Sequence, residues 1–465
     1  MSQRGRPSYD LSRVDQLEPE TIPDVIPQDP SSRAAYARML AMDAAIYGLP
    51  SVYQYAQMYV QAVDRSSPSY TGFDEWLHQR EPATADFTTF KTPNVDTLYS
   101  NAWLDLSEGP ALVRIPQIES RYYTLHFLDM YSNATNLSSR TVGAGGGDFL
   151  VVTPEWSGEV PRGVTAFRVA TPYMWILMRI LVGESAADVE RVRALQDAVE
   201  IRPTADVGSG SFPAAAPAAA ESDWRTFFEA LDWVLRANGH PLQEDAYVHR
   251  FRSIGIGGGE PLELARLDQS TRGGMEAGFA AAMDVIRNSR AQIGVAIGET
   301  GWVTGSAGEC GFNYLRRALL NFAGTGGNVI AEKQFFATYG SVSSGPLDGS
   351  KFDYVIRFET PPPVRGHWSL TLYPASTGLF YRNEIDRYAI APTTPGLRHG
   401  ADGSLTVFIQ HERPADAANW LPCPRGEFYL DLRTWEPGPG IRSGDWRPPP
   451  VMPVRSRAAA GAGPG

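Results

Sequence analysis

Carboxylate, phenol and amide side chains are concentrated in two segments of this sequence, 92–106 and 121–133. Both segments are rich in aromatic and β-branched residues and are punctuated by Pro and Gly, which predicts β-strands. Core strands are apolar, yet Asp96 and Asp129 lie in these segments. A buried carboxylate must be hydrogen-bonded or hydrated, and one whose pKa is raised by burial can transfer protons. We therefore predict that Asp96 and Asp129 face one cavity and act as acid and base.

Strand alternation divides the segment 121–133 into two faces. We interpret one face as the wall of a pocket, and it carries Tyr123, Leu125, Phe127, Asp129 and Tyr131. The other face carries Tyr122, Thr124, His126, Leu128 and Met130. The candidate catalytic residues are the two carboxylates and neighbouring phenols: Asp96, Asp129, Tyr99, Tyr123 and Tyr131. The candidate substrate-binding residues offer amides, imidazoles and flat aromatic walls: Asn94, His126, Asn133, Asn136, His367, Trp368, Tyr373 and Trp420.

These groups suit acid–base chemistry without a cofactor on a small polar or natural-product substrate. Hydrolysis of a glycosidic, amide or ester bond is the first expectation. Isomerisation, cyclisation or elimination is an alternative. A non-catalytic carbohydrate-binding protein is another, because aromatic platforms beside Asn and Asp also recognise sugars. A structural alternative also stays open, in which the aspartates brace loops by accepting hydrogen bonds from backbone amides.

The sequence lacks the motifs that are typical of several other catalytic mechanisms. The sequence contains no Gly-x-Ser-x-Gly elbow of an α/β-hydrolase and no His-Glu-x-x-His pair of a zinc metalloprotease. The Gly-rich loops 141–148 and 255–259 fit neither a phosphate-binding loop nor a dinucleotide-binding fingerprint. Seven histidines are scattered without metal-ligand spacing, and two cysteines, Cys310 and Cys423, permit one disulfide but no cysteine-based zinc site. We expect neither a transition metal nor a cofactor, and a calcium site formed by residues distant in sequence stays open.

The composition and net charge of the chain limit the classes of partner that it is expected to bind. The net charge is -11 with no long run of Lys or Arg, so neither nucleic acid nor an anionic membrane is an expected partner. The most apolar run, 174–182, is broken by Arg179 and is too short to span a bilayer. Residues 1–13 lack the apolar centre of a secretory signal, so a cytoplasmic location is expected. The expected partner is a small-molecule substrate, and a homodimer stays open.

The order of β-like and helical patterns predicts a mainly β protein with α-helical additions, in which two antiparallel β-sandwich or jelly-roll-like domains pack together. Short strands fill two sections, and helices are expected over 33–47, 51–63 and 328–339. A loosely packed end is expected after 437 because that stretch is rich in Pro, Gly and Ala. The predicted divisions are an extended arm (1–30), a helical segment (31–86), a first β domain (87–200), a linker (201–221), a helical middle region (222–344), a second β domain (345–440) and a C-terminal extension (441–465).

Two sets of motifs resemble a bacterial pair of domains of unknown function, numbered 1254 and 1214. The first set is Asn94-x-Asp96-Thr-Leu-Tyr99, Arg121-Tyr-Tyr, Asp129-x-Tyr131, the Gly-rich loop and Pro154-x-Trp156. The second is Leu347-Asp-Gly-Ser350, His367-Trp-Ser-x-Thr-x-Tyr373, Asn383, Asp402-Gly-Ser404, Asn419-Trp-Leu-Pro422 and Arg433. The resemblance covers most of the chain and implies two β-sandwich-like domains with helical additions, but no agreed reaction. His367 departs from the family, which more often has Phe there, and many relatives are exported.

Overall fold

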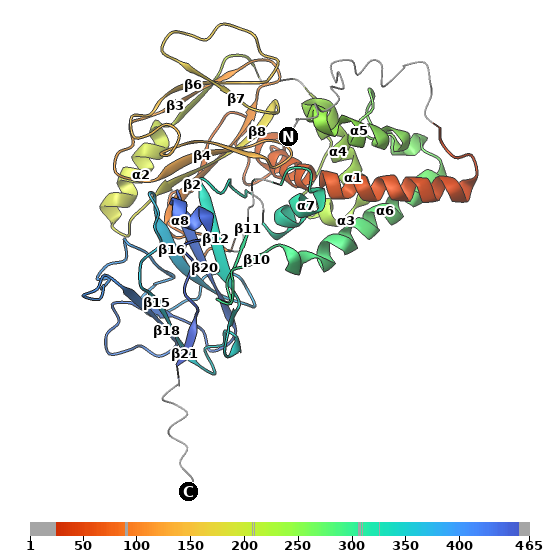
Figure 1. The fold of residues 1–465 in the computed structure, drawn as a ribbon. Helices are drawn as coiled ribbons and strands as arrows, with labels where there is room; N and C mark the ends of the chain where they lie inside the picture. The colour runs from red at the N-terminus through yellow and green to blue at the C-terminus, as the bar shows by residue number, and fades with distance from the viewer. Residues whose placement is uncertain are drawn as a thin grey trace, which may run out of the picture.

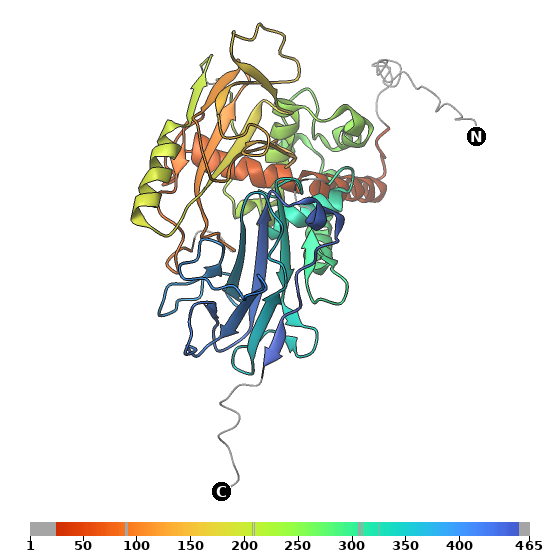
Figure 2. The same cartoon turned by 60° about the vertical axis from the view of Figure 1, so that its left-hand side comes forward.

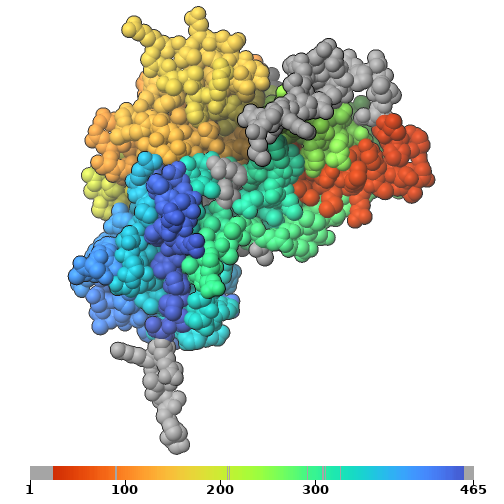
Figure 3. Space-filling view, viewed as in Figure 1, coloured from red at the N-terminus to blue at the C-terminus, as the bar shows by residue number. Residues whose placement is uncertain are grey.

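The computed structural model describes residues 25–88, 92–206, 208, 210–305, 308, 310–324 and 326–454. Two β-sandwiches lie one above the other, with a helical lobe beside them (Figure 1). The view turned by 60° shows the same contact between the sandwiches (Figure 2). The space-filling view shows them packed against each other on the face in view (Figure 3).

The first sandwich consists of two mostly antiparallel sheets. One sheet has the order β1 (Leu77–His78), β2 (Thr97–Asp105), β8 (Tyr173–Leu181), β4 (Tyr123–Leu128), β5 (Ala134–Ser138). The other has the order β7 (Thr165–Arg168), β6 (Gly147–Val152), β3 (Ala111–Ile115), β9 (Glu200–Pro203). Alternate residues such as Leu125, Ile176 and Val113 fill the core between the sheets. Helix α2 (Ala186–Ala198) adds Val189 and Val192 to this core.

The second sandwich repeats this arrangement. One sheet has the order β10 (Val295–Ala296), β11 (Val303–Gly305), β12 (Lys333–Thr338), β20 (Phe428–Trp435), β16 (Trp368–Pro374), β17 (Ala389–Ile390). The other has the order β19 (Trp420–Pro422), β18 (Leu405–Gln410), β15 (Asp353–Phe358), β21 (Met452–Val454). A short hairpin joins β13 (Gly340–Ser341) and β14 (Gly345–Pro346). Phe336, Leu370 and Leu432 face Ile356 and Val407 in the core. The predicted class, antiparallel sandwiches with helical additions, is confirmed, but the strand orders are not clearly those of a jelly roll.

The helical lobe forms around one long helix, α1. Its elements are α1 (Pro30–Met58), η2 (Tyr59–Val63), α3 (Ala219–Ser222), α4 (Trp224–Asn238), η3 (Leu242–Glu244), α5 (Asp245–Val248), η4 (His249–Ile254), η5 (Leu264–Arg266), α6 (Gln269–Asn288), η6 (Arg290–Gln292) and α7 (Tyr314–Ala323). The Asp29 carboxylate caps α1 by accepting the Ser32 amide. The predicted break at 48–50 is wrong, because α1 continues through Pro50. Burial against α4 and α6 outweighs the loss of one backbone hydrogen bond.

Three other expectations differ from the structure. The helix expected over 328–339 is wrong, because strand β12 occupies the centre of the second sandwich there. The expected linker begins with strand β9, which pairs with β3. The expected loose end is ordered as far as residue 454, with α8 (Pro439–Ser443) and β21, and Val451 is buried. The arm 1–24 and the tail 455–465 lie outside the described residues.

The disulfide that the sequence permits is not formed, and burial raises the pKa of the Cys423 thiol to about 12.

Candidate functional site

One sheet of each sandwich turns a polar face toward the other sandwich. On the first sheet, Arg179 of β8 lies in register between Tyr99 of β2 and Thr124 of β4. Two residues further along these strands, His126 of β4 pairs with Asn136 of β5. The opposite side of the same strands carries the apolar core, so strand alternation places every one of these polar groups on the outer face.

The facing sheet of the second sandwich presents a matching polar row. Lys333 of β12 pairs with Trp435 of β20, and Arg433 pairs with Ser369 of β16. The next rung pairs Asp431 with Thr371. We call the following residues the inter-sheet polar cluster: Tyr99, His126, Asn136, Arg179, Lys333, His367, Ser369, Asp431, Arg433 and Trp435.

Arg179 lies between the two sheets. Its guanidinium carbon is 5.4 Å from the ring centre of Tyr99 and 5.8 Å from that of Trp435. Its Nη1 lies 3.3 Å from Nδ1 of His126, and its Nε has no hydrogen-bond partner among the described residues. Burial, followed by the charges of Arg179 and Lys333, lowers the pKa of His126 well below its usual value. His126 is therefore neutral at neutral pH.

Lys333 contributes an amine to the cluster, and the pKa of this amine is strongly lowered. Its Nζ lies 4.9 Å from the ring centre of Trp435. Burial, followed by the charges of Arg433 and Arg179, lowers the Lys333 pKa to about 7, against the effect of Asp431. A large fraction of this amine is therefore unprotonated near neutral pH, when it can accept a proton.

Arg433, in contrast, is held by several partners. It forms an ion pair of 2.8 Å with Asp431, and its guanidinium donates to Thr371 Oγ1 (3.1 Å) and to the carbonyl oxygen of Thr92 (3.0 Å). Its guanidinium carbon also lies 5.7 Å from the ring centre of Tyr373. The hydroxyl of Tyr373 donates to the Pro93 carbonyl, so Tyr373 helps to hold the segment that leads to β2.

A separate network beside the cluster joins the sandwiches. Glu332 is fully buried and accepts hydrogen bonds from Tyr122 (3.0 Å), Ser138 (3.0 Å) and Arg140 (2.9 Å). Burial raises its pKa, although these donors oppose the shift. Every oxygen of this carboxylate has a partner, as expected of a structural contact.

Asp96 connects the cluster to a pocket at the junction of the sandwiches. The pocket encloses about 90 Å³, and its wall includes Asp96, Glu184 and Arg387. Oδ2 of Asp96 lies 3.6 Å from Nε2 of His367, and neither atom has a hydrogen-bond partner within the described part of the chain. Asn94 positions Asp96, because its side-chain oxygen accepts the Asp96 amide at 2.9 Å. The pocket is therefore where the cluster approaches the molecular surface.

The prediction that Asp96 and Asp129 share a cavity is wrong. Asp96 precedes β2 and Asp129 follows β4, and the β8 partners of those two strand ends are Leu181 and Trp175. Six residues of extended strand, about 20 Å at roughly 3.3 Å per residue, separate the two carboxylates. The Asp129 carboxylate accepts the amides of residues 131 and 133 and the Asn133 side chain, each at 2.8 Å. It braces the turn after β4.

The face chosen as the pocket wall is also wrong. Tyr123 lies in the core of the first sandwich, and its hydroxyl donates to the Gly143 carbonyl at 2.7 Å. Tyr131 packs in the helical lobe and donates to the Gly239 carbonyl. Twist and pairing place the opposite face, with His126, against the second sandwich.

The two predicted indole walls do not face the cluster. Trp368 is buried in the core of the second sandwich, on the other side of β16 from Ser369. Trp420 is buried in β19 and donates its Nε1 hydrogen to the Gln410 carbonyl at 2.8 Å. Of the predicted residues, the structure brings together Asp96, Tyr99, His126, Asn136 and His367.

Sequence reasoning missed Arg179, Lys333, Asp431 and Trp435 as site residues. Arg179 gave a usable signal, because a single Arg inside an apolar run must find a polar neighbour or a ligand. Lys333 gave none, since its segment was expected to be helical.

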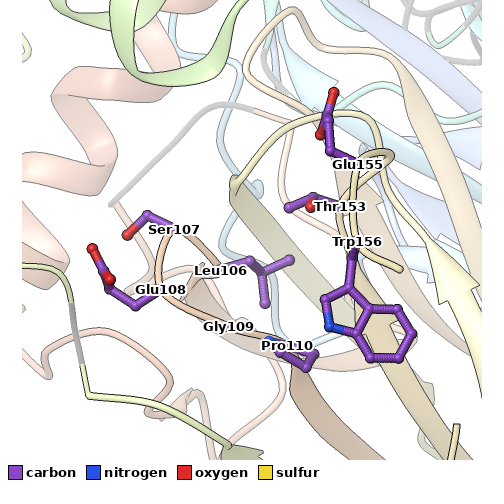
Figure 4. Close-up of a pocket in the computed structure, with 8 residues that line it drawn as sticks. All are labelled: Leu106, Ser107, Glu108, Gly109, Pro110, Thr153, Glu155 and Trp156. Atoms are coloured by element: carbon purple, nitrogen blue, oxygen red, sulfur yellow. The ribbon is translucent and has the colours of Figure 1, made fainter. Parts of the chain in front are cut away.

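A larger hollow lies on the first sandwich (Figure 4). Its wall includes Ser107, Glu108, Glu155 and Trp156. The close-up shows the two glutamate side chains at separate edges of the hollow rather than directed toward one point. This hollow is therefore a weaker candidate site than the cluster.

Two further features can be stated for the described part of the chain. It contains no group of three or more His, Cys, Asp or Glu side chains placed to hold a metal ion. Within the same residues, every helix is too short or too polar to cross a bilayer.

Comparisons with known proteins agree with this two-part architecture. Two family models match: protein of unknown function (DUF1254) over residues 73–203 and protein of unknown function (DUF1214) over residues 332–439. The crystal structure of the VPA0106 protein from Vibrio parahaemolyticus has a TM-score of 0.71 at 24% identity, covering 90% of this chain and 100% of that chain. A putative uncharacterized protein from Burkholderia cenocepacia gives a TM-score of 0.44 at 13% identity, covering 97% and 93% of the two chains. No curated protein matches the sequence.

The first matched region contains Arg179 and His126, and the second contains Lys333 and Arg433. Each matched region thus supplies one wall of the inter-sheet polar cluster. The chain therefore contains one DUF1254 domain and one DUF1214 domain.

Proposed function

We propose that this protein is an enzyme that performs acid–base chemistry without a cofactor on a small polar molecule at the inter-sheet polar cluster. One observation carries the proposal: the cluster and the adjoining Asp96 contain ionisable side chains together with buried polar atoms that have no hydrogen-bond partner among the described residues. These atoms are Arg179 Nε, His126 Nε2, His367 Nε2, Ser369 Oγ, Asp431 Oδ1, Asn136 Oδ1, Trp435 Nε1 and Asp96 Oδ2. Each costs about 1–3 kcal/mol when it is left unpaired.

The neighbouring Glu332 network provides the contrast. It also joins the sandwiches, yet both of its carboxylate oxygens are satisfied. An interface that served only to join domains would be expected to pair its groups in that way. Unpaired groups concentrated in one place favour a site that is completed by a ligand.

The roles follow from position and charge. Lys333 is the base, because its amine can accept a proton at neutral pH. Arg179 stabilises negative charge that develops on a substrate oxygen. The Asp96–His367 pair, on the side nearest the pocket, exchanges the proton with water.

These roles favour some reactions over others. Glycosidic hydrolysis requires two carboxylates within about 10 Å, whereas Asp96 and Asp129 lie at opposite ends of the sheet. A base (Lys333) beside a cation (Arg179) is suited to hydrolysis of an ester or amide bond. The excess of cations favours a second candidate, isomerisation or elimination through proton abstraction next to a carbonyl, because the enolate is an anion.

The test measures both reactions with the purified protein. Release of nitrophenol from nitrophenyl esters reports hydrolysis, and deuterium exchange of enolisable keto acids, followed by NMR, reports proton abstraction. We expect Lys333→Met to lower the rate at least 100-fold with an unchanged circular dichroism spectrum. Lys351→Met is the matched control, since Lys351 is exposed and pairs with Asp348. A folded Lys333→Met variant with wild-type turnover would refute the assignment.

A further inference from the structure

The charges of the inter-sheet polar cluster are unbalanced. Asp431 pairs with Arg433 at 2.8 Å, and Asp96 faces His367. Arg179 lies against the His126 ring nitrogen and two aromatic rings, and Lys333 lies against the Trp435 ring. Neither cation forms an ion pair with a carboxylate of the described residues. Because burying a cation without a counter-charge is costly, an anion is the expected missing component.

The unpartnered groups also favour an anion. Arg179 is 6% exposed and Trp435 is 1% exposed, and each has an N–H group for which the described residues offer no acceptor. The hydroxyl of Ser369 also lacks a partner among these residues and can donate a hydrogen bond. An arginine fork, an indole N–H and a hydroxyl are together suited to the oxygens of an anion.

The surroundings indicate which kind of anion. The guanidinium of Arg179 is flanked by the rings of Tyr99 and Trp435, and the Trp435 ring centre lies 5.0 Å from that of Tyr122. Aromatic walls favour an apolar body attached to the charged group. Inorganic ions lack such a body.

We propose that the inter-sheet polar cluster binds a small organic carboxylate, with Arg179 as its counter-charge. This inference rests on the proposed function and specifies the substrate class of the same site. The carboxylate lies against Arg179, with its carbon skeleton between the aromatic rings. Lys333 then lies next to the part of the molecule that exchanges a proton.

The experiment measures ligand binding by calorimetry and by thermal shift, without any need for turnover. The probes are acetate, pyruvate and benzoate at constant ionic strength, with acetamide and benzamide as neutral isosteres and with chloride and inorganic phosphate. We expect the carboxylates to bind at least tenfold more tightly than the amides and the inorganic anions. We expect Arg179→Gln to weaken carboxylate binding at least tenfold and Arg179→Lys to weaken it less.

Arg317→Gln is the matched control, because Arg317 is also buried, 2% exposed, but lies in the helical lobe among Tyr47, Tyr131 and Tyr314. It should bind carboxylates as the wild type does. In the absence of ligand, Arg179→Gln should melt at or above the wild-type temperature, since an unpaired cation has been removed.

Each outcome either supports or overturns the inference that the cluster binds a carboxylate. Carboxylate binding that is equal in the wild type and Arg179→Gln would overturn the site, and preferential binding of phosphate or chloride would overturn the ligand class. A lack of binding by every carboxylate would overturn the inference as well. Carboxylate binding without turnover of any probe supports the inference and counts against the proposed enzymatic function, so the two failures are distinguishable.

Discussion

Lys333 allows the most direct test of the electrostatics of the inter-sheet polar cluster. The pKa of its amine is lowered from 10.5 to about 7, chiefly by burial and then by Arg433 and Arg179. The protonated amine is therefore disfavoured in the folded protein. Each pKa unit corresponds to about 1.36 kcal/mol, so the shift amounts to about 5 kcal/mol.

The sign of the pH dependence follows from proton binding. Below pH 7 both the folded and unfolded states hold the Lys333 proton, and the full cost of the buried charge is present. Between pH 7 and 10.5 the unfolded chain keeps the proton while the folded protein has released it. The wild-type free energy of unfolding should therefore rise by about 1.4 kcal/mol per pH unit in this window, relative to Lys333→Met.

NMR can measure the pKa directly, because the sequence contains three lysines, Lys91, Lys333 and Lys351. Carbon-13 labelling at lysine Cε gives one signal for each residue, and Lys333→Met and Lys91→Arg identify them. We expect the Lys333 signal to titrate near pH 7. Lys351 is the internal control, since its ion pair with Asp348 raises its pKa above 10.5. A Lys333 signal that titrates near 10, or a Lys333→Met stability difference that is constant from pH 6 to 9, would contradict this reasoning.

Three further predictions concern stability and can be checked by urea unfolding. Asp129→Ala should lower the free energy of unfolding by about 2 kcal/mol, because two backbone amides lose their acceptor, and carboxylate binding should be unchanged. Gly278→Ala should lower the free energy of unfolding by about 1–3 kcal/mol, because a Cβ there would lie 2.4 Å from the Arg38 carbonyl oxygen. Gly273→Ala on the same helix places its Cβ in open space and should raise the free energy of unfolding by up to about 1 kcal/mol. Val451→Ala should cost about 2 kcal/mol, and no loss would show that the strand after α8 does not support the core.

The local pattern of the sequence was sufficient for the fold class. The residue pattern in 98–106, 122–131 and 428–432 identifies strands, because one buried face requires an apolar residue at every second position. It was insufficient for β12, since a short apolar run around Phe335 and Phe336 has no periodicity that separates strand from helix. Pairing with β20 decides its conformation.

Residue chemistry by itself also identified part of the site. Asp96, Tyr99, His126 and His367 could be named from their types and from the strands that carry them. Which face of β4 meets the second sandwich could not be read from alternation, because both faces include polar and apolar residues.

Tertiary structure alone decided how far apart the two aspartates lie and which cations join the histidines. Asp96 and Asp129 flank two parallel-running strands, β2 and β4, that are separated by β8, so their distance depends on register rather than on sequence spacing. Arg179 and Lys333 are far apart in the chain and come together only because two sheets face each other. The burial of the Lys333 amine and its repulsion by Arg433 and Arg179, which set the Lys333 pKa, exist only in that packed arrangement.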